Sequence, residues 1–412
     1  MSNTILTPTI YTMECLRILE NNLVFAKNAS REYDPKFGVS GAKIGYTLNI
    51  RRPARYTVST GAALDVQDYT ETSIPLTLTT QAHVDTTFTT ADMTVSLDEF
   101  SDRVLKPVMP ALANKVDFDG LVNAQNTVGQ HVGTPGTLPA TAAAILAAGQ
   151  MLDEHGTPRD GQRSAVFDPA SQAALIGGLS GLFNSQSRLA EQFEQGEFVD
   201  ARATLGFLLA MDQNVSFHTV GALGGTPAVN GGSQGITSGW ANTTSLVTDG
   251  WTAAAAQRLN AGDIFTIAGV YSVNPQNRTT TGQLQQFVVT ADASSDGSGN
   301  LTAVISPAII SDGAFQNVTA APADGALITV VGTAATAYRR NLAYHKDAFR
   351  LGTADLIEVS QFGAWGARKN YKGISMRVAR QYLIATDTVP CRTDILYGWG
   401  TVYQELATQV AG

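Results

Sequence analysis

The sequence predicts an α+β protein in which an all-β module interrupts a mixed chain. Three observations support this prediction. One long helical pattern covers residues 94–128, alternating strand patterns flank it, and a series of short strands separated by turn residues fills residues 221–332. Strands without helices indicate a small sandwich or closed barrel. Exposed loop tips tolerate insertions, so the module reads as an insertion into a mixed host fold.

The long helix is predicted over residues 96–127, with Ser96 as its N-cap. Pro107 and Pro110 should bend it, because each removes an intrahelical hydrogen bond. The pattern allows two interpretations: an ordinary core helix in two segments, or a spine that carries separate lobes. Apolar residues recur at steps of three and four, which places them on one face. These candidate core residues are Leu97, Phe100, Val104, Val108, Leu112 and Val116.

The chain begins with a predicted arm, residues 1–43, in which Thr9 to Ala29 has the pattern of an amphipathic helix. Residues 44–81 alternate in the manner of strands and predict an extended hairpin with a basic first limb and an acidic return. It is either a solvated hairpin whose own charges pair, each pair contributing at most about 1 kcal/mol, or an outreaching hairpin that lies on a neighbouring subunit. The candidate intersubunit contacts are Arg51, Arg52, Arg55, Asp65, Asp68 and Glu71.

After the helix, the Gly- and Pro-rich residues 129–139 predict a linker into a second lobe. There a helix is expected from Thr141 to Glu154, with Ile145, Leu146 and Met151 facing inward. A short buried strand follows, and then a helix capped by Asp168. Beyond residue 333 the mixed texture returns. Two long strands are expected there, joined by a turn at Thr388–Pro390, in a segment rich in Lys and Arg.

Composition limits the function. Charged residues make up 15% of the chain, against roughly 25% in ordinary soluble proteins. A weakly charged surface suits a protein that buries much of itself against its own copies, although a β-rich extracellular protein has a similar composition. The net charge of −8 argues against a protein whose main task is gripping nucleic acid. Cys15 and Cys391 form no disulfide framework and are expected to be reduced thiols. No signal peptide or apolar membrane span is visible, which predicts synthesis in the cytoplasm.

The sequence lacks the motifs that are typical of enzymes and metal sites. No phosphate-binding P-loop is present. Ser233 has the letters of a nucleophile motif but lacks the strand and helix that position one. The segment from Asp292 starts like a calcium loop, but Ala303 occupies the position where a Glu is required. The histidines are scattered. The sequence therefore predicts no catalytic, cofactor-binding or metal site, and no enzyme.

The order of parts resembles that of tailed-bacteriophage major capsid proteins with the Hong Kong 97-type fold. It is most similar to the coat-protein family of the short-tailed Salmonella phages, which carry an inserted β-barrel. Two stretches carry the resemblance: AHVDTTFTTADMTVSLDEFSDRVLKPVMPALANKVD, which looks like the strand leading into the spine helix, and LNAGDIFTIAGVYSVN with QQFVVTA and LTAVISPAII, which looks like the barrel. The closing strands ending in TDILYGWGTVYQEL are similar in style.

The resemblance implies a shell protein of the virion whose copies form hexamers and pentamers of an icosahedral capsid around double-stranded DNA, without sequence-specific contacts. A scaffolding protein and a portal are implied partners, and a membrane is not. The implied parts are an N-terminal arm (1–43), an E-loop hairpin (44–81), a peripheral domain (82–138 and 341–412), an axial domain (139–220 and 333–340) and an inserted β-barrel (221–332).

Two other interpretations stay open on the sequence alone. One is the shell of a bacterial nanocompartment with the same fold, which would enclose a protein cargo. The inserted module counts against it. The other is a non-enzymatic protein whose β-module binds a glycan or host surface, with Trp240 and Trp251 as stacking platforms; tryptophans of a core or a strand edge are the commoner case.

Overall fold

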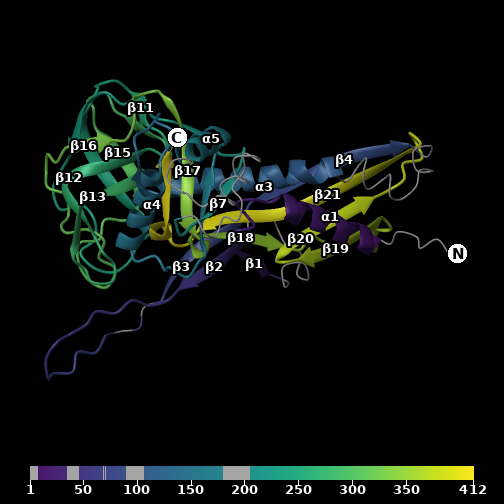
Figure 1. Ribbon diagram of the computed structural model, residues 1–412, viewed down its shortest axis with the longest axis horizontal. Helices are drawn as coiled ribbons and strands as arrows, with labels where there is room; N and C mark the ends of the chain where they lie inside the picture. Colours follow the sequence, from purple (N-terminus) through teal and green to yellow (C-terminus); the bar gives the residue numbers. More distant parts are fainter. Residues whose placement is uncertain (1–7, 35–45, 68, 70, 90–105, 180–204) are drawn as a thin grey trace. The chain divides into compact units, whose positions relative to one another are not determined.

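The computed structural model describes residues 8–34, 46–67, 69, 71–89, 106–179 and 205–412 (Figure 1). These residues fall into two compact units, each built from segments that are distant in the sequence. The first unit comprises Met1–Ile50, Pro75–Gly120 and Phe349–Gly400, and the second Arg51–Ile74, Leu121–Ala348 and Thr401–Gly412.

The first unit is built on a six-stranded sheet. Its strand order is β1-β18-β21-β20-β19, and β4 also pairs with β21. β21 is the long central strand and pairs antiparallel with β4 from Tyr397↔Thr80 to Thr388↔Thr89. The bounds are β1 Ser30–Asp34, β4 Thr80–Thr89, β18 Phe349–Ala354, β19 Trp365–Tyr371, β20 Ile374–Arg380 and β21 Thr388–Thr401, with the 3-10 turn η5 at Val359–Phe362.

Two helices pack on this sheet and close the first core. α1 spans Pro8–Asn22, and α3 spans Lys106–Thr127. α1 buries Tyr11, Cys15, Leu16 and Leu19 against α3 and the sheet, at the three- and four-residue spacing of one helix face. The predicted helix to Ala29 instead ends at Asn22, where the chain turns toward β1. The sheet side of the core contains Leu351, Ile374, Met376, Val378, Ile395 and Tyr397.

α3 contains the second half of the predicted long helix. Of the candidate core residues, Leu112 and Val116 are buried in the first core and Val108 packs against it. Leu97, Phe100 and Val104 lie outside the described residues. Pro107 is in the first turn, where its missing N–H costs no hydrogen bond, whereas Pro110 lies inside the helix. α3 crosses from the segment of the first unit into that of the second.

β2 (Tyr46–Arg52) and β3 (Thr72–Leu78) form a two-stranded sheet, and the loop between them is the tip of the predicted hairpin. β3 alternates buried and exposed residues. Its inward residues Ile74, Leu76 and Leu78 are almost fully buried. One face of the hairpin base is therefore buried against the core.

The host part of the second unit is another six-stranded sheet, ordered β5-β22-β17-β6-β7 with β8 also on β17. β17 extends across the predicted domain boundary at 340/341. The core of this host part contains Ile145, Leu152, Phe167, Leu175 and Leu209. The bounds are β5 His131–Val132, α4 Ala142–Glu154, β6 Arg163–Phe167, α5 Pro169–Leu179, β7 Leu208–Met211, β8 Phe217–Thr219, β17 Ala337–His345, η4 Lys346–Ala348, η6 Gln404–Leu406 and β22 Ala407–Ala411.

Residues 221–332 are strands and turns with a core of their own, which we call the β-module. Its main sheet is ordered β16-β12-β13-β15-β10-β9, and β11 pairs with β14. An antiparallel bridge, Ala228↔Leu327, joins chain at the two ends of that order. The bounds are β9 Gly225–Val229, β10 Thr244–Trp251, β11 Ala256–Leu259, β12 Ile264–Val273, β13 Thr280–Val289, β14 Ala293–Ser295, β15 Leu301–Ser306 and β16 Ile328–Val330.

Several local predictions are tested directly. Asp168 caps α5 as predicted, accepting hydrogen bonds from the backbone N–H groups of Ala170 and Ser171. Leu146 was expected to face inward but is exposed, because the buried face of α4 passes through Ile145, Ala148 and Leu152. The turn expected at Thr388–Pro390 is also wrong. Those residues pair with β4, and the turn occupies residues 381–387.

Candidate functional site at the root of the charged hairpin

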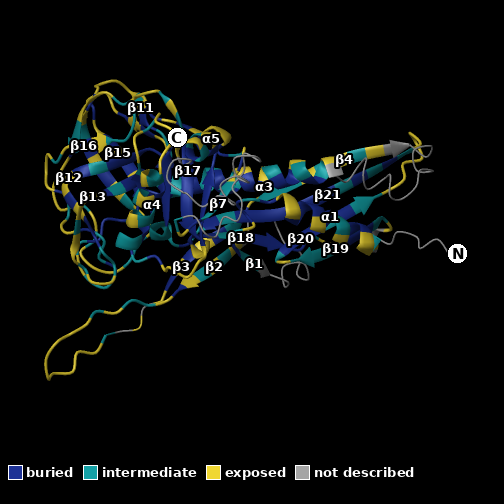
Figure 2. Cartoon of the chain, viewed as in Figure 1, coloured by how far each residue is buried: buried dark blue, intermediate teal, exposed yellow. Residues whose placement is uncertain are grey.

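The hairpin loop, residues 53–71, exposes apolar side chains to an unusual degree. The side chains of Val58 and Leu64 are 92% and 90% exposed. Most of the loop is coloured as exposed in Figure 2. Exposed apolar residues gathered on one segment are typical of surfaces that other molecules bind. The set comprises Tyr56, Val58, Leu64, Val66 and Tyr69.

The two limbs of the loop are held together by a few polar contacts. The Gln67 side chain bridges to the backbone of Thr57, accepting from its N–H at 2.7 Å and donating to its carbonyl at 2.5 Å. Ser59 Oγ donates to Asp65 Oδ2 at 2.5 Å. These contacts join residues across the loop and keep its extended form without an apolar core.

The charges predicted to contact a neighbour divide into two groups. Arg51 and Glu71 form an ion pair at 3.1 Å, in which the Arg51 side chain is 79% exposed and the Glu71 side chain 36%. Glu71 also accepts a hydrogen bond from the Tyr69 hydroxyl at 2.6 Å, and this bond raises the pKa of Tyr69. Asp65 lies on the exposed part of the loop, and Asp68 lies outside the described residues. Arg51 and Asp65 therefore remain accessible to a partner.

Arg52 and Arg55 have a different environment, which we call the hairpin root. Each donates from Nη2 to the same oxygen, Oε1 of Glu405, at 2.7 Å. Arg52 is buried, and its guanidinium lies 4.4 Å from the ring centre of Tyr403. Arg-to-ring stacking of this kind is favourable when the cation is desolvated. Glu405 was not identified from the sequence, since only the fold brings η6 beside residue 52.

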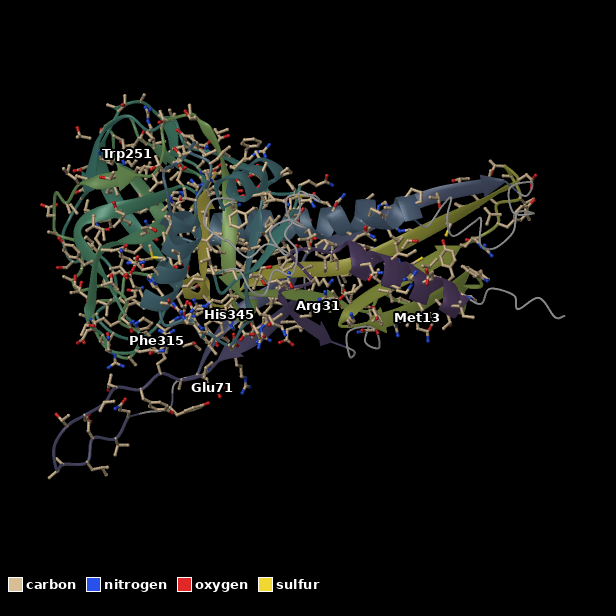
Figure 3. The ribbon with its side chains drawn as sticks, viewed as in Figure 1. Met13, Arg31, Glu71, Trp251, Phe315 and His345 are labelled. Carbon is tan, nitrogen blue, oxygen red and sulfur yellow. The ribbon has the colours of Figure 1, made fainter. Side chains whose placement is uncertain are left out.

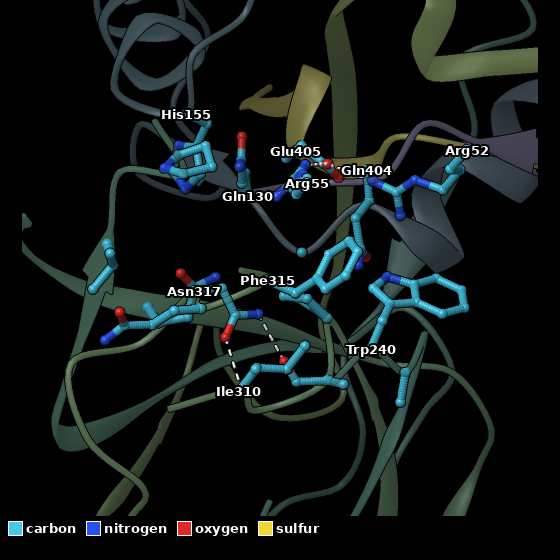
Figure 4. A pocket seen from close by; sticks show the side chains of 18 residues that line it. Arg52, Arg55, Gln130, His155, Trp240, Ile310, Phe315, Asn317, Gln404 and Glu405 are labelled. Atoms are coloured by element: carbon cyan, nitrogen blue, oxygen red, sulfur yellow. Dashed lines mark hydrogen bonds and ion pairs between the residues drawn. The ribbon is translucent and has the colours of Figure 1, made fainter. Parts of the chain in front are cut away.

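The β-module contributes two aromatic rings to the same place. Arg52 lies 5.6 Å from the ring centre of Trp240, and Arg55 lies 5.7 Å from that of Phe315. A cavity of about 70 Å³ separates the root from the module. In Figure 4 the two rings face the arginines across it. The cavity is further lined by Gln130, His155, Gln285, Asn317 and Gln404.

His155 is the titratable ring in the cavity wall. It is buried, and this burial lowers its pKa. Nδ1 lies 2.8 Å from the carbonyl oxygen of Met151, and Nε2 lies 3.3 Å from Ser272 Oγ. Both ring nitrogens therefore face structural partners, and the ring connects α4 to β12. The site consequently has two guanidinium groups, one carboxylate and a neutral imidazole, an arrangement suited to holding chain segments together.

Other predicted or excluded sites can be placed. Ser233 is in an exposed loop, where its backbone N–H bonds the carbonyl of Pro322. Trp251 lies among the strands of the β-module (Figure 3), buried in its core, so it is not a stacking platform. Within the described ranges, no group of three His, Cys, Asp or Glu residues could hold a metal ion. No helix in those ranges is both long and apolar enough to cross a membrane.

Comparison with known proteins identifies the relatives. Residues 2–412 match the family described as P22 coat protein, gene protein 5. The chain is also 24% identical over 289 residues, 67% of each sequence, to a major capsid protein of Acyrthosiphon pisum secondary endosymbiont phage 1. These matches favour a phage coat protein over the nanocompartment and glycan-binding interpretations.

Similar solved structures come from phages. A chain from Mycobacterium phage Che8 covers 94% of this chain and 90% of its own length, at 12% identity and a TM-score of 0.44. A capsid chain of cyanophage P-SCSP1u covers 94% and 88%, at 11% identity and a TM-score of 0.42. The I-domain of the CUS-3 coat protein is 31% identical over 26% of this chain and 96% of its own length, with a TM-score of 0.20.

Proposed function

Because this chain belongs to the P22 coat protein family and is the major capsid protein of a tailed phage, we propose that its copies form the hexamers and pentamers of an icosahedral head enclosing double-stranded DNA. Self-assembly into a shell is the property of the family, and the α+β architecture fits the Hong Kong 97-type fold. The protein is accordingly a component of the virion. The family match over residues 2–412 is the observation that carries this proposal.

The finer partners follow from the same proposal. A scaffolding protein and a portal take part in building the head, and the packaged DNA is enclosed without sequence-specific contacts. The net charge of −8 supports the last point, since a negative wall does not bind the genome tightly. The family is structural, so the protein performs its role through contacts between subunits and not through catalysis.

The proposed division of labour assigns an arm to residues 1–43, an E-loop hairpin to 44–81 and an inserted β-barrel to 221–332. The peripheral domain takes residues 82–138 and 341–412, and the axial domain takes 139–220 and 333–340. The separate core of the β-module supports treating it as a unit. So does the bridge between the ends of its sheet order.

We propose that the exposed part of the hairpin contacts a neighbouring subunit. Val58, Leu64 and Val66 would provide its apolar area, and Arg51, Asp65, Asp68 and Glu71 its polar rim. Interfaces commonly combine a buried apolar centre with charged residues around it. Arg52 and Arg55 take part from the root, where Glu405 holds them.

Paired substitution of Leu64→Ser and Val66→Ser tests the hairpin contact. Both side chains are exposed in the subunit, so the variant should fold normally but lose apolar area that only assembly buries. We expect particles from the parent protein and unassembled subunits from the variant, measured by sedimentation velocity and negative-stain microscopy. Val247→Ser, at an exposed apolar residue of β10, is the matched control and should assemble. Normal particles from the double variant would show that the hairpin does not make the contact.

A further inference from the structure

The β-module holds the hairpin at a point beyond the root. Arg278 lies in the turn between β12 and β13, and its Nη2 donates to the main-chain carbonyl of Tyr56 at 2.7 Å. Its backbone has a positive φ of 55°, a conformation uncommon for a residue with a side chain. The Nε atom is buried without an acceptor. The turn therefore directs the Arg278 guanidinium to the hairpin backbone, and the Nε atom of that group loses its contact with water.

Two aromatic rings of the module support the same segment. Phe315 and Trp240 belong to a small apolar cluster with Ala308 and Ile310, so their positions are set by packing inside the module. Their faces lie near the Arg55 and Arg52 guanidinium groups, as described above. Positions 52, 55 and 56 of the first limb are thus each contacted by a residue of the module.

A third connection passes through η6. Ser306 Oγ, at the end of β15, donates to Gln404 Oε1 at 2.8 Å. The adjacent residue Glu405 receives both root arginines. One short turn is consequently bonded to the module and to the hairpin, which makes the module, η6 and the root a closed triangle of contacts.

We propose that the β-module acts as a strut that sets the direction of the hairpin in its own subunit. The contacts are hydrogen bonds and cation–ring pairs around a cavity of about 70 Å³. These contacts orient the loop and leave its apolar residues exposed. The consequence for assembly, presentation of the hairpin in one orientation before a neighbour arrives, depends on the proposed function; the strut itself does not.

Distances between spin labels in the full-length, unassembled subunit test the strut. We would introduce Ala63→Cys at the loop tip and Thr302→Cys on β15, both exposed positions. The natural thiols do not interfere, because Cys15 and Cys391 are buried and burial raises the pKa of Cys15 to about 12. The parent should give one narrow distance distribution. In Arg278→Gln and in Phe315→Leu we expect a distribution about two-fold wider, since a loop with few buried contacts opens easily.

Gln276→Ala is the matched control, since this residue is in the same turn and its amide lies beside Gly156. It should leave the distribution narrow. Circular dichroism checks that each variant is folded. A broad distribution in the parent, or an unchanged one in both Arg278→Gln and Phe315→Leu, would overturn the strut. Particle formation is measured separately: failure of the parent to assemble would count against the proposed function, while the label distances would still decide the strut.

Discussion

At the scale of single residues, buried polar groups determine how loops are held on the sheets. Asp117, in α3, is almost fully buried, and its two carboxylate oxygens accept the backbone N–H groups of Val24 and Ala26 at 2.7 and 2.8 Å. These N–H groups follow the end of α1. One carboxylate of α3 therefore fixes the path of the chain from α1 toward β1.

Replacing Asp117 by alanine should strongly destabilise the subunit. The change leaves two N–H groups without acceptors, and losing hydrogen bonds to a buried charged group costs about 3 kcal/mol of the free energy of unfolding. Urea denaturation of unassembled subunits would measure it. Lys115→Ala, at an exposed residue of the same helix, should change the free energy of unfolding by less than about 0.5 kcal/mol. Equal effects of the two substitutions would contradict the assigned role.

Buried histidines should make the subunit sensitive to acid. Burial, with a smaller contribution from Arg340, lowers the pKa of His131 to about 3, whereas an unfolded histidine titrates near 6.5. Below pH 6.5 this histidine binds a proton in the unfolded chain but stays neutral in the folded chain, so the free energy of unfolding decreases as the pH falls. His155 and His218, whose pKa values are also lowered by burial, act in the same direction.

We therefore expect the free energy of unfolding to fall between pH 7 and pH 5, with His131 accounting for about 2 kcal/mol at pH 5. His131→Leu removes the titrating group and should flatten that part of the pH dependence. Urea midpoints of both proteins at several pH values would test this. Identical slopes for parent and variant would show that His131 is not responsible.

At the scale of elements, α3 shows a glycine used for close packing. Gly120 lies where the rings of Phe25 and Trp399 meet the helix, and a Cβ there would come within 2.7 Å of Phe25 and 2.6 Å of Trp399. The two rings are tilted by 36° with centres 5.0 Å apart, and Trp399 Nε1 donates to the carbonyl of Val116 at 2.9 Å. Glycine has a low helix propensity, but its lack of a side chain lets the aromatic pair approach the helix backbone at this turn.

Gly120→Ala should destabilise the subunit by about 1–3 kcal/mol, the usual cost of overpacking a core. Propensity alone predicts the opposite, a gain of about 1 kcal/mol. Gly149→Ala in α4 is the control, because its added Cβ would meet Phe207 at an ordinary 3.5 Å. That variant should be neutral or more stable. Thermal unfolding of the two variants compares them directly, and a stabilised Gly120→Ala would refute the packing argument.

At the scale of the whole molecule, the β-module has its own core. The large buried residues Phe265, Phe287, Ile305 and Trp251 belong to one apolar cluster. The residues of the host sheet form a separate cluster. The rings of Phe265 and Phe287 are 5.9 Å apart at the centre of it. A module with an independent core has the main requirement for independent folding.

A fragment of residues 221–332 should therefore fold alone. We expect dispersed amide resonances and one cooperative unfolding transition by circular dichroism. In the same fragment, Phe287→Ala should lower the free energy of unfolding by about 3–5 kcal/mol, the cost of emptying a core site of that size. A fragment without a cooperative transition would mean that the module depends on the host fold.

Much of the element order was predictable because it depends on local pattern. Period-two alternation indicated the hairpin and the closing strands, and the cap at Asp168 located α5. Where alternatives were locally equivalent, the prediction was wrong. Leu146 and Ile145 are adjacent on α4, and only packing against β22 and its neighbours selects the face that is buried. The turn placed at Thr388–Pro390 belongs to β21, because pairing with β4 extends that strand over residues with weak strand signals.

The sequence by itself determined the α+β class, the interruption by an all-β module and the charged hairpin, because spacing and composition are local properties of the chain. Only the tertiary structure decided which charged side chains of the hairpin are exposed and can contact another molecule. Arg51, Arg52 and Arg55 look equivalent in the sequence, yet Glu405 and the module's aromatic rings hold two of them while Arg51 stays exposed. Glu405 lies 353 and 350 positions along the chain from Arg52 and Arg55, and only the folded chain brings these charges within the few ångströms over which they interact strongly.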